Sequence, residues 1–160
     1  MKVVSGGQTG VDRGALDAAL SCGIDTGGWC PAKRLAEDGL IPGKYPVTEL
    51  PDAGYIQRTR QNVIDSDGTV VIYFSYPAGG TEQTIHFCIE HGKPYLLIDA
   101  DEITINRAAT RIREFYTLQG IEVLNVAGPR ASGEPRAYDY ARETLLSFLS
   151  SEIVSTADVD

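Results

Sequence analysis

The stretch SGGQTGVD, residues 5–12, decides how this chain begins to fold. The apolar pair Val3-Val4 precedes it and apolar residues recur at helical spacing after it, so it predicts a strand, a glycine turn and a helix. Glycine tolerates positive φ and lets a ligand approach the backbone closely. A helix start offers free N–H groups to an anion. The spacing is neither G-x-G-x-x-G nor G-x-x-x-x-G-K-S/T, so neither of those phosphate-binding motifs explains the turn.

Strand and helix patterns alternate along the rest of the chain. Apolar runs predict strands at residues 2–5, 24–28, 69–74, 94–99 and 121–126, and helical spacing predicts helices at 11–22, 54–64, 81–91, 104–119 and 134–149. The run TVVIYF, residues 69–74, is continuously apolar, which is typical of a parallel strand covered on both faces. We therefore expect an α/β fold with a mostly parallel sheet and helices on both of its faces.

The length of 160 residues favours one domain. We expect residues 1–150 to form a single ligand-binding domain and residues 151–160 to be a flexible C-terminal tail. Between residues 29 and 52 the chain is irregular and contains Pro31, Pro42, Pro46 and Pro51. An irregular segment of this length is unusual in a compact domain unless it is functional. We call residues 29–52 the excursion.

Charge and composition exclude several classes of function. Lys and Arg number 14 against 22 Asp and Glu, a net charge of −8, whereas nucleic-acid-binding proteins carry a basic footprint. A small anionic ligand stays compatible, because it needs only local positive potential. The chain opens directly on a predicted strand and contains no run of 18 apolar residues, so we expect a cytoplasmic protein without a membrane partner. Its three cysteines form no C-x-x-C pair, which suits reduced thiols.

Three glycine-containing turns follow predicted strands, at residues 6–10, 79–81 and 128–132. In open α/β sheets, ligands bind outside the carboxyl ends of the strands, so these turns should meet at one edge. Their glycines and the following helix starts favour a phosphate or nucleotide-like ligand. The residues that we expect to bind it are Gly6, Gly7, Gln8, Thr9, Gly10, Arg13, Gly79, Gly80, Thr81, Gly128, Arg130 and Ser132.

Several basic side chains and one tryptophan stand near the turns and are candidate ligand contacts. Arg130 is the best basic candidate, because a guanidinium can bond two phosphate oxygens. Arg13, in the first helical turn, opposes the helix dipole and faces either the ligand or solvent. Arg58 and Arg60 are two residues apart on a predicted helix, so at most one of them should reach the pocket. Trp29 either stacks on a flat ring or packs in the core.

Catalytic and metal-binding signals are weak. Asp12 and Glu82 are the only candidate catalytic carboxylates, and both stand at helix starts, where a carboxylate stabilises the helix by itself. Thr9 and Asp12 have the spacing of a capping box. His86 and His91 are five residues apart rather than four, so no helix-borne zinc pair is expected, and we expect no metal site.

A set of motifs resembles a known family. "SGGQTGVDRGALDAAL", "GGWCPAKRLAEDGLIPGKYPVTEL", "RTRQNVIDSDGTVVI", "GGTEQT", "GKPYLLID" and "NVAGPRAS" together resemble the putative molybdenum carrier family, from about Val3 to Leu149. This family is similar to a Rossmann-like superfamily that includes molybdenum cofactor carrier proteins, lonely-guy nucleotide phosphoribohydrolases and lysine-decarboxylase-like proteins. The resemblance implies a doubly wound Rossmann-like sheet, a homo-oligomer (dimer or tetramer) and a pocket for a phosphorylated, nucleotide-like ligand. Molybdenum cofactor, a pterin bearing a phosphate, would be one such ligand.

Two departures bear on whether the protein is an enzyme. The phosphoribohydrolases carry Pro-Gly-Gly-x-Gly-Thr-x-x-Glu, and here Thr84 stands at the glutamate spacing after Thr81. Glycosidic hydrolysis requires a carboxylate, so a carrier or binding protein is our leading expectation. The alternatives are a nucleotide N-glycosidic-bond hydrolase that uses Asp12 or Glu82, and a sensor of a nucleotide-derived ligand. In the family a lysine directly follows the proline of "WCP", whereas here Ala32 comes before Lys33.

Overall fold

The computed structural model describes residues 1–157 and is built around a five-stranded sheet. Every neighbouring pair of strands in this sheet is parallel, as the apolar runs predicted. The strands stand in the order β2-β1-β9-β7-β8. Their bounds are Lys2–Val4 for β1, Asp25–Gly27 for β2, Gly68–Tyr73 for β7, Tyr95–Asp99 for β8 and Val123–Ala127 for β9.

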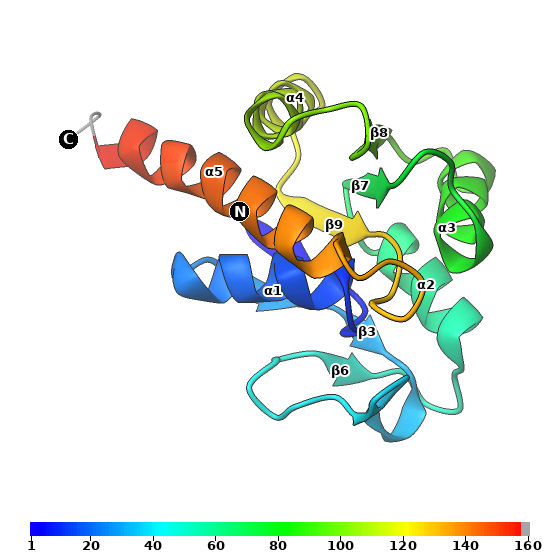
Figure 1. Cartoon of the computed structure of the whole chain (residues 1–160). Coiled ribbons are helices and arrows are strands. Elements are labelled where there is room, and N and C mark those ends of the chain that lie inside the picture. Colours follow the sequence, from blue (N-terminus) through cyan, green and yellow to red (C-terminus); the bar gives the residue numbers. More distant parts are fainter. Residues whose placement is uncertain (158–160) are drawn as a thin grey trace.

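Helices cover both faces of the sheet (Figure 1). Helices α1, α4 and α5 lie on one face, and α2 and α3 lie together on the other. Their bounds are Val11–Ser21 for α1, Tyr55–Ile64 for α2, Gly79–Glu90 for α3, Ile105–Leu118 for α4 and Ala137–Ala157 for α5. The expected Rossmann-like α/β fold is confirmed. Among residues 1–157, no helix combines the length and the apolar character that a membrane span requires.

The order of the strands shows how the chain runs through a Rossmann sheet. Numbered along the chain, the five strands stand in the order 2-1-5-3-4. If the fifth strand, β9, is renumbered as the first, the order becomes 3-2-1-4-5, which is the Rossmann order. The sheet is therefore a Rossmann sheet whose chain begins at the second strand. The order reverses between β9 and β7, and in such sheets the ligand crevice lies at this switch point.

Small residues on α1 allow close packing of the long helix α5. Ala15, Ala18 and Ala19 are buried in the main core between the sheet and α1, α4 and α5. At Gly14, an added Cβ would lie 2.6 Å from the carbonyl oxygen of Tyr138 on α5. Real Cβ atoms do not approach backbone oxygen that closely, so a side chain at position 14 would push α5 away. The "GALDAAL" pattern thus sets the distance between these two helices.

Helix α5 is longer than predicted. It begins at Ala137 and continues to Ala157, past the expected end at Leu149. Residues 150–157 contain no glycine or proline, so nothing local stops the helix. The Arg113 side chain on α4 also donates a hydrogen bond to Ser151 and pairs with Glu152 at 3.4 Å. The rest of the predicted tail, residues 158–160, lies outside the described residues.

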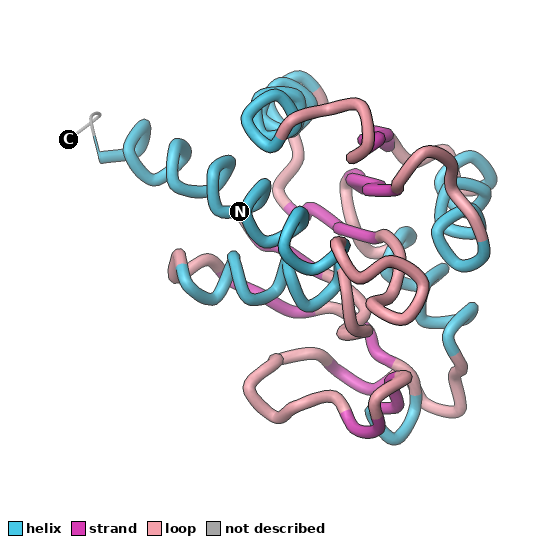
Figure 2. The backbone as a smooth tube through the Cα atoms, viewed as in Figure 1, coloured by secondary structure: helices cyan, strands magenta, loops and turns pink. Residues whose placement is uncertain are grey.

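The excursion is folded, although the sequence predicts it as irregular. Figure 2 shows it as loop with short strand pieces. Strand β3 (Trp29–Cys30) pairs with β6 (Thr48–Glu49), β4 (Leu35–Ala36) pairs with β5 (Gly39–Leu40), and a short 3₁₀ turn covers Ala32–Arg34. The guanidinium of Arg34 donates to four carbonyl oxygens of residues 41–47, at 2.9–3.3 Å. The excursion packs on α1 through a small core, formed by Leu16 of α1 with Cys30, Ala36, Ile41, Tyr45 and Val47.

Candidate functional site

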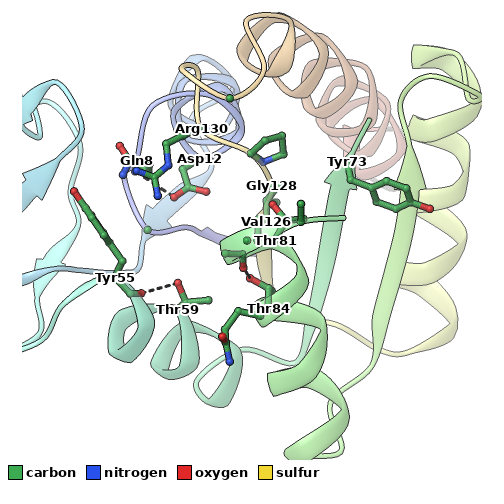
Figure 3. Close-up of a pocket in the computed structure, with 18 of the residues that line it drawn as sticks. Gln8, Asp12, Tyr55, Thr59, Tyr73, Thr81, Thr84, Val126, Gly128 and Arg130 are labelled. Atoms are coloured by element: carbon green, nitrogen blue, oxygen red, sulfur yellow. Dashed lines mark hydrogen bonds between the residues drawn. The ribbon is translucent and has the colours of Figure 1, made fainter. Parts of the chain in front are cut away.

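A cavity of about 670 Å³ lies at the carboxyl ends of the strands, at the switch point between β9 and β7 (Figure 3). Residues of all three glycine turns line it, together with residues from α2 and α3. The turns therefore meet at one edge of the sheet, as their positions after strands predict. The predicted ligand-binding residues in the lining are Gly6, Gln8, Gly79, Gly80, Thr81, Gly128 and Arg130. Whether they bind a ligand stays a prediction.

Two glycines allow the first and third turns to touch. Gly10 has φ +82°, and a Cβ there would lie 2.4 Å from the carbonyl oxygen of Pro129. At Gly128, a Cβ would lie 2.5 Å from a methyl group of Val11 and 2.6 Å from the carbonyl oxygen of Ile72. The backbone N–H of Val11 donates to the Pro129 carbonyl at 3.2 Å. These contacts join the start of α1 to the turn after β9 and shape one wall of the cavity.

The start of α3 opens into the cavity. Its N-cap residue, Ala78, has no side chain that can cap the helix. Gly79 has φ +54°, and an added Cβ at Gly79 or Gly80 would meet nothing within 4 Å. The first N–H groups of a helix have no intrahelical acceptor and carry partial positive charge. The start of α3 therefore offers an uncrowded place for an anionic group.

A buried ion pair forms the floor of the cavity. Nη1 of Arg58 on α2 lies 3.2 Å from Oδ2 of Asp12, and the two side chains are 11% and 6% exposed. The backbone N–H of Gln8 donates to the same oxygen at 3.1 Å. Burial raises the pKa of the Asp12 carboxyl, and Arg58 and Gln8 oppose that rise. Of the Arg58–Arg60 pair, Arg58 is the one in the lining, which agrees with the prediction that at most one would reach the pocket.

Two buried donors at the cavity have no acceptor. They are Nε of Arg58 and Nε2 of Gln8, and neither is hydrogen-bonded among the described residues. The other end of the Gln8 amide is satisfied, because its Oε1 accepts the N–H groups of Thr9 and Glu37. Leaving a buried donor unpaired is costly, and both nitrogens are covered by protein atoms rather than open to the cavity.

Aromatic rings and Arg130 form the outer wall. The guanidinium carbon of Arg130 lies 5.5 Å from the centre of the Tyr55 ring, within the range of a cation–π contact. Tyr76 is 72% exposed at the rim, which leaves its ring free to stack. Phe74 instead packs edge-on against Tyr140, with ring centres 5.9 Å apart. Tyr73 lines the cavity, but its ring points away from Asp12 (Figure 3).

Five predicted ligand-binding residues do not line the cavity and serve to join segments. Gly7 packs against the excursion, since a Cβ there would lie 2.9 Å from Ile41. Nε of Arg13 donates to the Gly7 carbonyl at 3.1 Å, and its other nitrogens donate to Asp38 at 2.6 and 2.8 Å. The hydroxyls of Thr9 and Ser132 both donate to Glu37. Gly10 makes the turn-to-turn contact described above.

Other sequence expectations differ from the structure. The N-cap of α1 is Gly10, so Thr9 and Asp12 form no capping box. Glu82 is exposed, lies 3.6 Å from His86 and stands outside the lining. Thr84, at the glutamate spacing, does line the cavity and donates its hydroxyl to the Gly80 carbonyl at 2.9 Å.

Among the described residues, the carboxylates in the lining are Asp12 and Glu134. Glu134 was not predicted from the sequence; its carboxylate accepts hydrogen bonds from Arg136, the nearest at 2.7 Å. Arg136 lowers the pKa of the Glu134 carboxyl, so this group stays ionised at neutral pH.

Trp29 lies outside this cavity. Its indole Nε1 donates to Asp65 at 2.8 Å, and the residue borders a second cavity of about 260 Å³. Lys33 is exposed on the excursion at φ 62° and is not in the lining, and Cys30 is fully buried.

Several lining residues were not identified from the sequence: Tyr55, Thr59, Asn62, Tyr76, Asn125 and Glu134. Asn125 carried a usable signal, because a polar residue inside the apolar strand VLNVA needs a reason. It is 3% exposed, and its Nδ2 donates to the hydroxyl of Thr69 at 3.2 Å. The others stand on helices and turns in ordinary polar contexts, with no local mark.

Comparisons with known proteins agree with this description. The family model described as "Circularly permutated YpsA SLOG family" matches residues 3–149. No curated protein matches the chain. A solved structure, the putative molybdenum carrier protein from Syntrophus aciditrophicus SB, is 46% identical, covers 92% of this chain and 94% of its own, and superposes with a TM-score of 0.90. A circular permutation is also what the strand order shows, and we conclude that the chain belongs to the circularly permutated YpsA SLOG family.

Proposed function

We propose that this protein binds a phosphorylated, nucleotide-like small molecule in the cavity between β9 and β7, as a carrier rather than as an enzyme. Molybdenum cofactor is the leading candidate for the ligand. The observation that carries the proposal is the uncapped start of α3, which faces a cavity of about 670 Å³. That volume is in the range of small-molecule sites. The 46%-identical neighbour named as a putative molybdenum carrier protein supports the same reading.

The phosphate end of the ligand is assigned to the start of α3. Gly79 and Gly80 leave space beside their own N–H groups at the helix start, and Thr81 adds a hydroxyl. Arg130, whose side chain is 47% exposed and only loosely paired with Glu37 at 4.0 Å, supplies positive charge at the rim. Arg58 is already paired with Asp12, so it adds less net charge. An acidic protein can thus hold an anion through local donors.

The flat part of the ligand is assigned to the outer wall. Tyr76 offers an exposed ring, on which a flat heterocycle stacks. A pterin phosphate carries both features: a flat ring and one anionic end.

Native mass spectrometry of freshly purified protein tests the proposal, with chemical identification of any small molecule that stays bound. We expect a phosphorylated pterin. A retained adenine nucleotide would favour the alternatives below, and protein that neither retains nor binds any phosphorylated compound would contradict the proposal.

A matched pair of variants locates the phosphate. Gly80 and Gly43 both lack crowding neighbours within 4 Å and have no positive φ, but Gly43 is in the excursion. Gly80→Asp places a negative charge at the start of α3 and should abolish retention, whereas Gly43→Asp should not. Equal retention by both variants would show that the phosphate is not at α3.

One observation favours a hydrolase as the second candidate. Asp12 lines the cavity, and burial raises the pKa of its carboxyl, which suits a proton donor. Incubation with nucleoside monophosphates and an assay for free base would detect cleavage. Base release that is lost in Asp12→Asn would establish the enzyme and displace the carrier reading.

A sensor whose ligand drives partner binding is the third candidate. It predicts that adding ligand changes assembly, which light scattering measures. The expected dimer or tetramer is tested in the same experiment.

A further inference from the structure

The excursion places a carboxylate between the first and third glycine turns. One oxygen of Glu37 accepts the Thr9 hydroxyl and the backbone N–H of Ser132, the latter at 3.1 Å. The other oxygen accepts the Ser132 hydroxyl. Nε of Arg130 lies 4.0 Å away. Two hydroxyls, an amide and a guanidinium therefore surround one negative group.

This set of donors has the composition of an oxyanion site. Hydroxyls, backbone amides and an arginine are the groups that bind phosphate in proteins. Thr9, Arg130 and Ser132 were expected from the sequence to bind the ligand. In the structure their negative partner is the chain's own Glu37. The site adjoins the main cavity, because Arg130 borders both.

Glu37 is held firmly in this position. Its backbone N–H donates to Oε1 of Gln8 at 3.0 Å. The next residue, Asp38, forms a two-pronged pair with Arg13 at 2.6 and 2.8 Å. Burial alone would raise the pKa of Glu37, but the hydrogen bonds from Ser132 and Thr9 hold it below its usual value, so the group is charged at neutral pH.

We infer that Glu37 is an intramolecular anion that fills a second oxyanion subsite beside the cavity and thereby restricts the ligand to a single phosphate end. The inference rests on the proposed function, which assigns that phosphate to the start of α3. A ligand that extends a second phosphate toward Arg130 meets a carboxylate already bonded to the same donors. Like charge repels it, and no free hydroxyl or amide compensates. The ligand class is therefore a phosphate monoester rather than a diphosphate.

Glu37→Ala removes the carboxylate and leaves the four donors in place. Glu90→Ala removes the same charge from an exposed site at the far end of α3 and serves as the control. Calorimetric titration with inorganic phosphate is done in the Gly80→Asp background, where the α3 site is blocked. We expect phosphate to bind at least about 10-fold more tightly with Glu37→Ala than with Glu90→Ala, because a charge-assisted hydrogen-bond network becomes available. Adding Ser132→Ala should remove that gain.

Selectivity is measured with AMP and ADP on the protein without the Gly80 change. The ratio of ADP to AMP affinity should rise about 10-fold in Glu37→Ala and stay constant in Glu90→Ala. Glu37→Gln keeps an acceptor for Ser132 but removes the charge, so it should raise the ratio in part. If urea unfolding shows that Glu37→Ala destabilises the protein, Glu37→Gln provides the test in its place.

The outcomes separate the two proposals. Equal phosphate affinities in Glu37→Ala and Glu90→Ala, with AMP bound by the wild type, overturn the subsite and leave the proposed function standing. Absence of AMP, ADP and phosphate binding in every variant overturns the inference together with the α3 phosphate site.

Discussion

Replacement of Arg58 by Met tests whether the buried ion pair supports the site. Met preserves much of the apolar length of the arginine side chain, so the change mainly removes charge. It leaves the 6%-exposed Asp12 side chain with the Gln8 N–H as its remaining close donor. At 3.2 Å the pair attracts by about 5 kcal/mol with an effective dielectric constant of 20. Removing one partner of a buried pair costs roughly 3–5 kcal/mol.

This loss should depend on pH in a definite direction. Burial already raises the pKa of Asp12, and Arg58 opposes the rise, so its removal raises that pKa further. A raised carboxyl pKa means that the folded protein takes up a proton where the unfolded chain does not. The penalty is therefore largest above the folded pKa and shrinks as the pH falls from the folded pKa toward the unfolded value of about 4. Between pH 7 and pH 5 the variant should recover up to about 2.7 kcal/mol, since each pH unit is worth about 1.4 kcal/mol.

Urea unfolding at pH 7 and pH 5 measures both quantities. Arg60→Met is the matched control, because Arg60 is an exposed arginine on the same helix and its loss should cost less than about 0.5 kcal/mol. The double variant Arg58→Met, Asp12→Asn should regain part of the stability, because no unpaired charge remains. Equal losses for Arg58→Met and Arg60→Met, or a loss that is unchanged at pH 5, would refute the reasoning.

Three further predictions concern the turns, the excursion and the rim. Gly10→Ala should lower the free energy of unfolding in urea by about 2–5 kcal/mol, because alanine is strained at positive φ and its Cβ would clash with Pro129. Gly23→Ala, which has the same strain in open space, should lower it by about 1–2 kcal/mol. Arg13 lowers the pKa of Asp38, so the stabilisation by this pair is present above about pH 4 and is lost as the pH falls below it. The protection of residues 29–52 against hydrogen exchange, relative to the intrinsic rate, should fall there in the wild type but not in Asp38→Asn, which lacks the pair. Tyr76→Ala should weaken ligand binding about 10-fold in calorimetry, and Tyr95→Ala, outside the cavity, should not.

Local patterns predicted the elements of the fold well. The five strands of the main sheet and the five α-helices each reflect a periodicity that is contained within the element itself. The predicted end of α5 was wrong, because a hydrogen bond from Arg113 on α4 to Ser151 holds its last turns, and these two residues are 38 positions apart. The excursion was predicted as irregular for the same reason. Its order comes from Arg34, from the Arg13–Asp38 pair and from a small core, all of which are non-local contacts.

The candidate site was predicted in part. Glycine turns that follow parallel strands must gather at one edge of the sheet, so the location of the cavity could be inferred without coordinates. The identity of the side chains that face it could not. Arg58 enters because α2 crosses beneath the first turn, and its guanidinium lies over Gly6, where a Cβ would come within 1.7 Å of Nη1. Tyr55 and Tyr76 enter because neighbouring segments happen to end at the same rim.

By itself, the sequence determined which segments are strands, helices and glycine turns, because those choices depend on residues a few positions apart. Only the tertiary structure decided the strand order, and with it the permuted Rossmann sheet and the pairing of Glu37 with Thr9 and Ser132. Glu37 lies 28 residues from Thr9 and 95 from Ser132, and no local preference specifies such a meeting. Packing of the excursion against α1 brings the Glu37 carboxylate to the two turns. The chain's own carboxylate therefore occupies a place where the sequence predicted the anionic group of a ligand.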